Sequence, residues 1–142
     1  MNKMILVSLI LLITIPKVAQ KSSERDNLIN LLKQFDKAIA KKDSVTLQKI
    51  LTDDFTGTIP NGESFKKNLF IQYHCNPHSK TRDIKDEPAK NWDIKISEGC
   101  AIINRVVTYL YKTNEVKVKR LDICLKIKGK WFIVSGQATE VL

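Results

Sequence analysis

The stretch that decides the fold is CAIINRVVTYLYKTNEVKVKRLDICLKIK, residues 100–128. Two long strand-like segments flank a Thr-Asn pair, so we expect an antiparallel hairpin in which Lys112 faces Glu115. This register places Arg105 opposite Asp122, pairing opposite charges across the hairpin. It also gathers apolar residues on the other face, which we expect to be the inner one: Ile102, Val106, Leu110, Leu121, Ile123 and Leu125.

The flanking segments extend this hairpin into a meander. A turn at Gly129 leads to a last strand, which adds Phe132, Val134, Gly136 and Ala138 to the apolar face. Upstream, residues 92–96 alternate apolar and polar side chains, and a three-residue loop ending at Gly99 joins them to the hairpin.

The first half of the chain predicts helices. Apolar residues at helical spacing form one stripe: Leu28, Leu31, Leu32, Phe35 and Ile39. Ser23 and Asp26 resemble a capping box at the start of this helix, which should end near residues 41–42. Asp43 can cap a second, short helix with inner residues Leu47, Ile50 and Leu51.

A short strand, a turn and a third helix should follow. Residues 55–59 alternate as a strand, and the Asn-Gly pair at 61–62 turns the chain. Ser64 can start the third helix, in which Phe65, Leu69 and Tyr73 share a face. Residues 74–91 read as a loop with an irregular edge strand.

The predicted fold class is therefore α+β. We expect a cone-shaped, strongly curved antiparallel sheet wrapped over a long N-terminal helix, with two shorter helices. Residues 20–142 should form a single domain, and the open end of the cone is a natural site for a small molecule.

This element order, together with LLKQFDKAIAKKDSVTLQKILTDDF (31–55) and KGKWFIVSGQATEV (128–141), resembles the nuclear transport factor 2-like superfamily. Within it, the chain is most similar to the SnoaL-like and calmodulin-kinase-association-type proteins. The resemblance spans nearly all of residues 20–142 and implies a curved-sheet homodimer. The superfamily includes isomerases, dehydratases, hydrolases and binding domains, so the resemblance does not indicate an activity.

Two positions argue against isomerase chemistry. In ketosteroid-isomerase-like members, the strand after the Asp-Asp pair ends in an acid before proline, and the matching residue here is Ile59. The tyrosine that those enzymes carry on the first helix matches Phe35. Neither residue can move a proton or stabilise an oxyanion. We therefore predict no catalytic residue, and we interpret Asp53 and Asp54 as residues of the turn between helix and strand.

The expected faces of the sheet supply two sets of candidate residues. Asn104 and Thr108 lie on the predicted apolar face, where a polar group needs a partner or a ligand. The predicted pocket residues are Phe35, Ile59, Tyr73, Trp92, Asn104 and Thr108. The opposite face is mixed, as interfaces are, and its predicted interface residues are Arg105, Tyr109, Tyr111, Asp122, Trp131 and Gln137.

His74, Cys75 and His78 have a spacing that zinc sites use. Pro77 interrupts the helix between the two histidines, and the chain has no third histidine. We therefore read this segment as a polar loop and predict neither a metal nor another cofactor.

Residues 1–19 have the order of a secretory signal: Lys3, an apolar run over residues 4–15, then Pro16 and Ala19. An uncleaved anchor is the alternative. Cleavage after Ala19 would give a periplasmic or secreted protein with no stable membrane anchoring.

Cleavage would also lower the Lys and Arg count from 24 to 22, against 15 Asp and Glu, and leave a net charge of +7. The lysines are spread along the chain, so we expect no nucleic-acid partner.

We therefore expect an exported, non-catalytic domain that binds a small apolar molecule in the cone, as a homodimer. One alternative is an enzyme of isomerase, dehydratase or hydrolase type that uses Asp54, His74 or His78. The other is a partner-binding module that uses its basic surface or a sheet face.

Overall fold

The computed structural model describes residues 17–81 and 83–141. Its elements are α1 (Lys17–Lys41), α2 (Ser44–Ile50), β1 (Leu51–Thr58), β2 (Ser64–Lys66), α3 (Lys67–Cys75), β3 (Asp83–Asp86), a 3₁₀ turn η1 (Ala89–Asn91), β4 (Asp93–Ser97), β5 (Cys100–Leu110), β6 (Glu115–Ile127) and β7 (Lys130–Glu140). The predicted signal peptide lies for the most part outside the described residues. No helix within them is long and apolar enough to cross a membrane.

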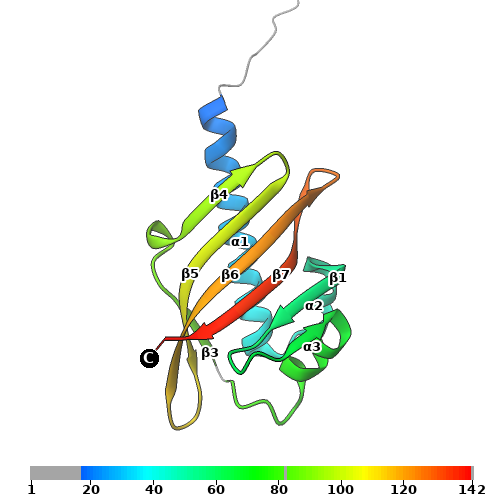
Figure 1. Cartoon of the computed structure of the whole chain (residues 1–142), viewed down its shortest axis with the longest axis vertical. Helices are drawn as coiled ribbons and strands as arrows, with labels where there is room; N and C mark the ends of the chain where they lie inside the picture. Colours follow the sequence, from blue (N-terminus) through cyan, green and yellow to red (C-terminus); the bar gives the residue numbers. More distant parts are fainter. Residues whose placement is uncertain (1–16, 82, 142) are drawn as a thin grey trace, which may run out of the picture.

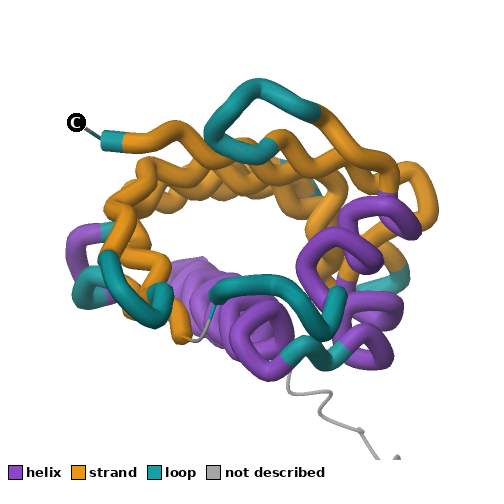
Figure 2. Tube along the Cα trace, turned by 90° about the horizontal axis from the view of Figure 1, so that it is seen from below, coloured by secondary structure: helices purple, strands orange, loops and turns teal. Residues whose placement is uncertain are grey.

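The described residues form a seven-stranded sheet in the order β2-β1-β7-β6-β5-β3, and β4 also pairs with β5. The sheet curves over α1, which lies behind it in Figure 1. Seen from below, the sheet lies on one side and the helices close the other (Figure 2). The predicted α+β cone is thus confirmed, but the sheet is mixed because β1 and β7 run parallel.

The predicted register of the long hairpin is wrong by two residues. Leu110 pairs with Glu115, and Arg105 lies opposite Arg120 instead of Asp122. The reason is a longer turn, closed by a hydrogen bond of 2.9 Å from the backbone N–H of Tyr111 to the carbonyl of Asn114. A shift of two residues keeps each side chain on its face, so the predicted grouping of residues on β5 and β6 survives.

The orientation of the two faces, however, is the reverse of the prediction. Ile102, which was expected inside, is 40% exposed on the convex face. The concave face that packs on the helices carries Ala101, Ile103, Val107, Val118 and Cys124, all buried, together with Arg105, Arg120 and Asp122. These charged groups pair with one another and with α1, so they can be buried.

The stripe on α1 is confirmed as the centre of the core. Leu28, Leu32 and Phe35 are fully buried and belong to the same cluster as Phe55 and Ile133 of the sheet. Because α1 begins at Lys17, Ser23 and Asp26 lie within the helix, and the predicted capping box is wrong.

An irregularity in β7 decides which of its residues face the helices. Ile123 pairs with Ser135 but Cys124 pairs with Ile133, so one residue of β7 is left over between them. Trp131 and Ile133 therefore point into the core with Gly136 and Ala138. The predicted grouping of Phe132 and Val134 with Gly136 and Ala138 is split at this point.

Helix α2 is capped as predicted, because the Asp43 carboxylate accepts the backbone N–H of Thr46 at 3.0 Å. Asp53 and Asp54 lie inside β1, so their assignment to a turn is wrong. Asp53 instead forms an ion pair of 3.1 Å with Lys67.

The third helix starts later than predicted, at Lys67, because Ser64–Lys66 form β2 and pair with β1. The buried face of the helix also differs from the predicted one. Phe70 and His74 point inward, whereas Leu69 is exposed. Tyr73 is half exposed and stacks on Phe65, with ring centroids 5.3 Å apart.

Candidate functional site

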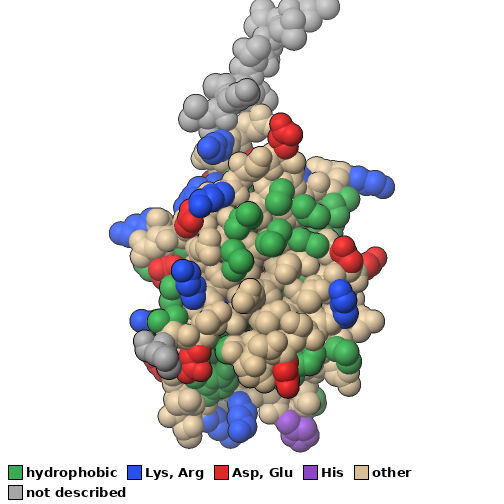
Figure 3. Space-filling model, in the orientation of Figure 1, with side chains coloured by type: hydrophobic (Ala, Val, Ile, Leu, Met, Phe, Trp, Pro, Cys, Tyr) green, Lys and Arg blue, Asp and Glu red, His purple; other side chains and the backbone are tan. Residues whose placement is uncertain are grey.

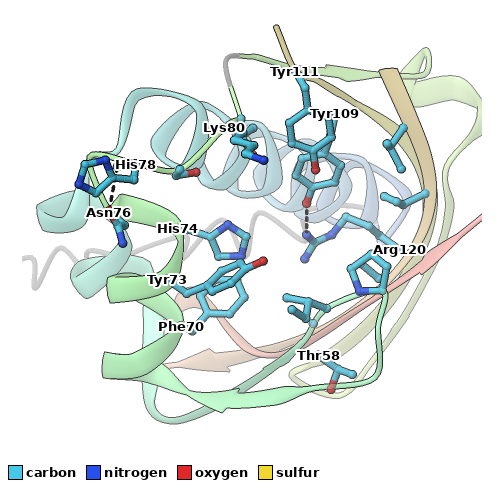
Figure 4. Close-up of a pocket in the computed structure, with 18 residues that line it drawn as sticks. Thr58, Phe70, Tyr73, His74, Asn76, His78, Lys80, Tyr109, Tyr111 and Arg120 are labelled. Atoms are coloured by element: carbon cyan, nitrogen blue, oxygen red, sulfur yellow. Dashed lines mark hydrogen bonds between the residues drawn. The ribbon is translucent and has the colours of Figure 1, made fainter. Parts of the chain in front are cut away.

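A cavity of about 470 Å³ opens at the wide end of the cone. Its walls come from the end of β1, from α3 and the loop after it, and from β5, β6 and β7. Figure 4 shows the side chains of α3 on one side and those of β5 and β6 on the other, facing the same space.

Arg120 of β6 forms the floor of this cavity. This residue is 3% exposed, and its guanidinium donates to the Asp122 carboxylate at 2.7 Å and to the Tyr109 hydroxyl at 3.0 Å. The guanidinium carbon lies 4.8 Å from the centre of the Phe35 ring, a cation–π contact. Burial alone would raise the pKa of Asp122, but the charges of Arg120 and Arg105 hold that pKa below its usual value.

The guanidinium has room because Gly136 of β7, which pairs with Asp122, has no side chain beside it. A Cβ at Gly136 would lie 2.9 Å from an Nη of Arg120 and 3.0 Å from an oxygen of Asp122. The backbone of Gly136 adopts no left-handed φ, so its requirement is purely one of space.

His74 of α3 lies on the opposite wall and points into the cavity (Figure 4). It is 8% exposed, and its ring packs on Phe70 with centroids 4.4 Å apart. Within residues 17–81 and 83–141, no hydrogen-bond partner of its imidazole is found. Burial, together with the charge of Arg120, lowers the pKa of His74 to about 3, so the ring is neutral at pH 7.

The mouth of the cavity is polar. Lys80 and Tyr111 lie there, and an adjoining hollow adds Lys112 from the β5–β6 turn. Burial raises the pKa of both Tyr109 and Tyr111, which keeps these phenols protonated.

A second cationic group, Arg105 of β5, lies in the core and joins four elements. Its guanidinium donates to Asp122 at 3.3 Å, to Asp36 of α1 at 3.0 Å, and to Asp86 of β3. Burial and the nearby charge of Asp36 raise the pKa of Asp86 to about 7. Trp92 covers the guanidinium, whose carbon lies 4.8 Å from the centre of the indole. This network ties α1 and the edge strand β3 to the centre of the sheet.

The structure divides the predicted pocket residues into three groups. Ile59 and Tyr73 line the cavity. Phe35 and Trp92 are buried in the core, against Arg120 and Arg105. Asn104 and Thr108 lie outside the cavity, because their side of β5 is the convex one.

The predicted interface residues are also divided. Arg105, Tyr109, Asp122 and Trp131 are buried within the single chain. Their placement on a face open to a second copy is therefore wrong, because α1 and the charge network cover that face. Tyr111 lies at the mouth of the cavity, and Gln137 is exposed.

The sequence reasoning missed Arg120 and considered His74 only as a zinc ligand and as an open catalytic alternative. In the described part of the chain, no group of three or more His, Cys, Asp or Glu side chains could hold a metal ion. Arg120 had one usable signal, since it precedes Asp122 by two residues and therefore shares its face of the strand.

The sequence matches no family model and no curated protein at a significant level. Solved structures, however, share its fold. An NTF2-like protein from Cytophaga hutchinsonii superposes with a TM-score of 0.73 at 20% identity, over 83% of this chain and 98% of the other. A candidate Ca/calmodulin-dependent kinase II association domain from Exiguobacterium sibiricum gives 0.72 at 13% identity, over 91% and 98%.

A candidate dehydratase of the NTF2-like family from Streptomyces avermitilis gives a TM-score of 0.71 at 12% identity, over 86% of this chain and 99% of the other. At these identities the similarity establishes the fold and leaves the activity open.

Proposed function

Because the chain has the NTF2-like fold, with a cavity at the open end of its cone, we propose that it is an exported, non-catalytic domain that binds a small molecule there. The observation that carries this proposal is the cavity itself. It has an aromatic wall on α3 and a buried arginine on its floor. A few polar groups set in a largely apolar wall are typical of small-molecule sites.

Two positions support binding over catalysis. Ile59 lines the cavity at the place where the resemblance would put a proton-transferring acid, and Phe35 lies beneath Arg120. A proton shuttle works best when its pKa is close to the working pH. The low pKa of His74 therefore makes it a poor base at pH 7.

An enzyme remains the second candidate, and one observation favours it. His74, one of the residues that a catalytic mechanism would need, points into the cavity with no hydrogen-bond partner among the described residues. If the bound molecule is recovered from the protein chemically unchanged after long incubation, this result would argue against an enzyme. Conversion of that molecule, and its loss in the variant His74→Gln, would establish it.

We also propose that the protein forms a homodimer through the convex face of the sheet. The apolar side chains of this face are only partly covered by the chain itself: Ile102, Leu121, Ile123, Leu125, Phe132 and Val134. Figure 3 shows hydrophobic side chains gathered on this side of the molecule. An exposed apolar patch of this kind is typical of an interaction surface.

Native mass spectrometry of the protein, purified from an exporting host without reducing agent, tests the binding function. We expect a discrete adduct on the wild type. Ala138→Phe, which fills the cavity from β7, should remove the adduct, whereas Thr139→Phe on the exposed neighbouring residue should keep it. An adduct that survives Ala138→Phe unchanged would contradict binding in this cavity.

A further inference from the structure

The charged side chains that line the cavity are all of one sign. Among its lining residues that the structure describes, Arg120 and Lys80 are cationic and none is Asp or Glu. The adjoining hollow at the mouth adds Lys112 and again no acid. Neither lysine forms an ion pair within the described residues. A cationic ligand would therefore meet repulsion along the whole path into the site.

Asp122 compensates part of the charge of Arg120, so the hydrogen bonds of the guanidinium matter more than its net charge. A guanidinium has five N–H groups. Three of them donate to Asp122 and Tyr109. The other two have no partner among residues 17–81 and 83–141.

Tyr109 adds a further donor next to Arg120. Its hydroxyl oxygen accepts from Arg120, which leaves its own hydrogen free, and Figure 4 shows this pair directed toward the cavity. A ligand without acceptors would leave all these buried donors unsatisfied, which is costly. The two remaining N–H donors, with a hydroxyl beside them, can serve the two oxygens of a carboxylate.

The other side of the cavity is largely apolar and aromatic. The rings of Phe70 and Tyr73 both pack on the neutral imidazole of His74 along α3, and Ile59 adds to this surface. This wall offers contact area to a hydrocarbon or an aromatic ring, and it carries no charge.

We propose that the ligand is an organic monocarboxylate, whose carboxylate binds Arg120 and Tyr109 and whose apolar or aromatic body lies against the wall formed by α3. This inference rests on the proposed binding function and specifies its ligand class. Lys80 and Lys112 raise the concentration of such anions at the mouth.

The test compares acids with amides of the same shape. The full-length chain, isotopically labelled, is titrated with 3-phenylpropionate and 3-phenylpropionamide, and with hexanoate and hexanamide. The NMR signals of Tyr109, His74 and the Arg120 guanidinium report on binding. We expect each acid to bind at least tenfold more tightly than its amide, because a charged hydrogen-bond partner is lost in the amide.

Three variants keep the test independent of a folding defect at Arg120. Tyr109→Phe removes one hydroxyl and should weaken binding of the acids about fivefold and of the amides less, because the lost hydrogen bond to an amide is a neutral one. Lys80→Gln should weaken binding of the acids about twofold through the lost attraction at the mouth. Lys95→Gln, on an exposed lysine of β4, is the matched control and should change nothing.

The outcomes separate the inference from the function on which it rests. Equal affinity for acids and amides would overturn the carboxylate class and leave the binding function standing. Equal affinity for inorganic phosphate and the acids would also overturn that class. An absence of shifts at all three reporters, with every probe, would overturn both proposals. An equal effect of Lys80→Gln and Lys95→Gln would show a nonspecific charge effect and contradict the role of the mouth.

Discussion

In a usual half-buried sheet the charged residues lie on the exposed face. In β5 and β6 three charged residues are buried on the concave face, and the more exposed convex face carries a row of apolar residues. The concave face, which packs on α1, carries Arg105, Arg120 and Asp122, and each of these is at most 3% exposed. The convex face carries a row of isoleucines and leucines that the chain itself covers only in part. Charge is buried here because each charged group has a charged partner, whereas the apolar side chains of the convex face stay partly exposed.

The comparison teaches that the polarity of a strand face does not by itself decide which side is buried. Burial of a charge is tolerated when opposite charges and hydrogen bonds satisfy it. The concave face meets this condition because Asp36 on α1 and Asp86 on β3 reach Arg105 from neighbouring elements.

Replacement of Arg105 should have the largest effect on the stability of the buried charged face. Arg105→Leu leaves the carboxylates of Asp36 and Asp122 buried without that partner, so we expect the free energy of unfolding to fall by about 3–5 kcal/mol. Urea denaturation measures this. Asn104→Leu, the adjacent convex residue, is the control and should change stability by about 0.5 kcal/mol or less. An equal fall in the free energy of unfolding of the two variants would contradict a stabilising role of the charge network.

The charge network also explains which parts of the fold could be predicted from the sequence. The helical stripe of α1, the cap at Asp43 and the meander all follow from local patterns, and the structure confirms them. The burial of Arg105 on the concave face is balanced in part by Asp36, which lies 69 residues from Arg105 along the chain. No pattern within a strand reveals such a partner.

The same limit applies to the site. Tyr73 and Ile59 were found because they lie on segments that the fold places at the mouth of the cone. Tyr109 was misplaced because it was assigned to the outer face, and Arg120 was missed because it was not singled out among the residues of its strand. His74 was recognised as a reactive residue, but its burial was not foreseen, because the predicted face of the helix carried Leu69 and Tyr73 instead.

Protonation of His74 gives the next largest effect. Its pKa is about 3 in the folded protein and near 6.5 when unfolded, so the unfolded state binds the proton first as the pH falls. Stability should therefore decline below pH 6.5, by at most about 1.4 kcal/mol per pH unit from this group.

Urea midpoints between pH 4 and pH 7 measure this slope. His74→Leu should flatten it, whereas His78→Leu, which replaces the exposed histidine at the mouth, should leave it unchanged. A slope that persists in His74→Leu would show that another group causes it.

Asp86 should act in the opposite direction. Its pKa is raised to about 7 in the folded protein, so the folded state keeps a proton that the unfolded state has already lost. Stability from this group is present at low pH and is lost as the pH rises from about 4 to about 7. Asp86→Asn should therefore remove this loss. Relative to the wild type, the free energy of unfolding of the variant should be higher at pH 8 than at pH 5.

The matched control is Asp83→Asn, at the exposed start of the same edge strand. Comparison of both variants with the wild type at the two pH values isolates the buried carboxylate. An identical response of the two variants would contradict the assignment of the pKa near 7 to Asp86.

The smallest effect on the fold, but a decisive one for the comparison, is expected on the convex face. Ile102→Lys adds a charge to a residue that is already 40% exposed, so the stability of the single chain should change by about 0.5 kcal/mol or less. If a second copy covers this face, the same charge must be buried without a partner, and the dimer should dissociate.

Sedimentation velocity distinguishes the monomer from the dimer. Lys95→Gln, the residue that pairs with Ile102 across β4 and β5, is the control and should stay dimeric. A monomeric wild type would refute the convex face as a dimer interface, and its half-covered apolar side chains would then need another partner.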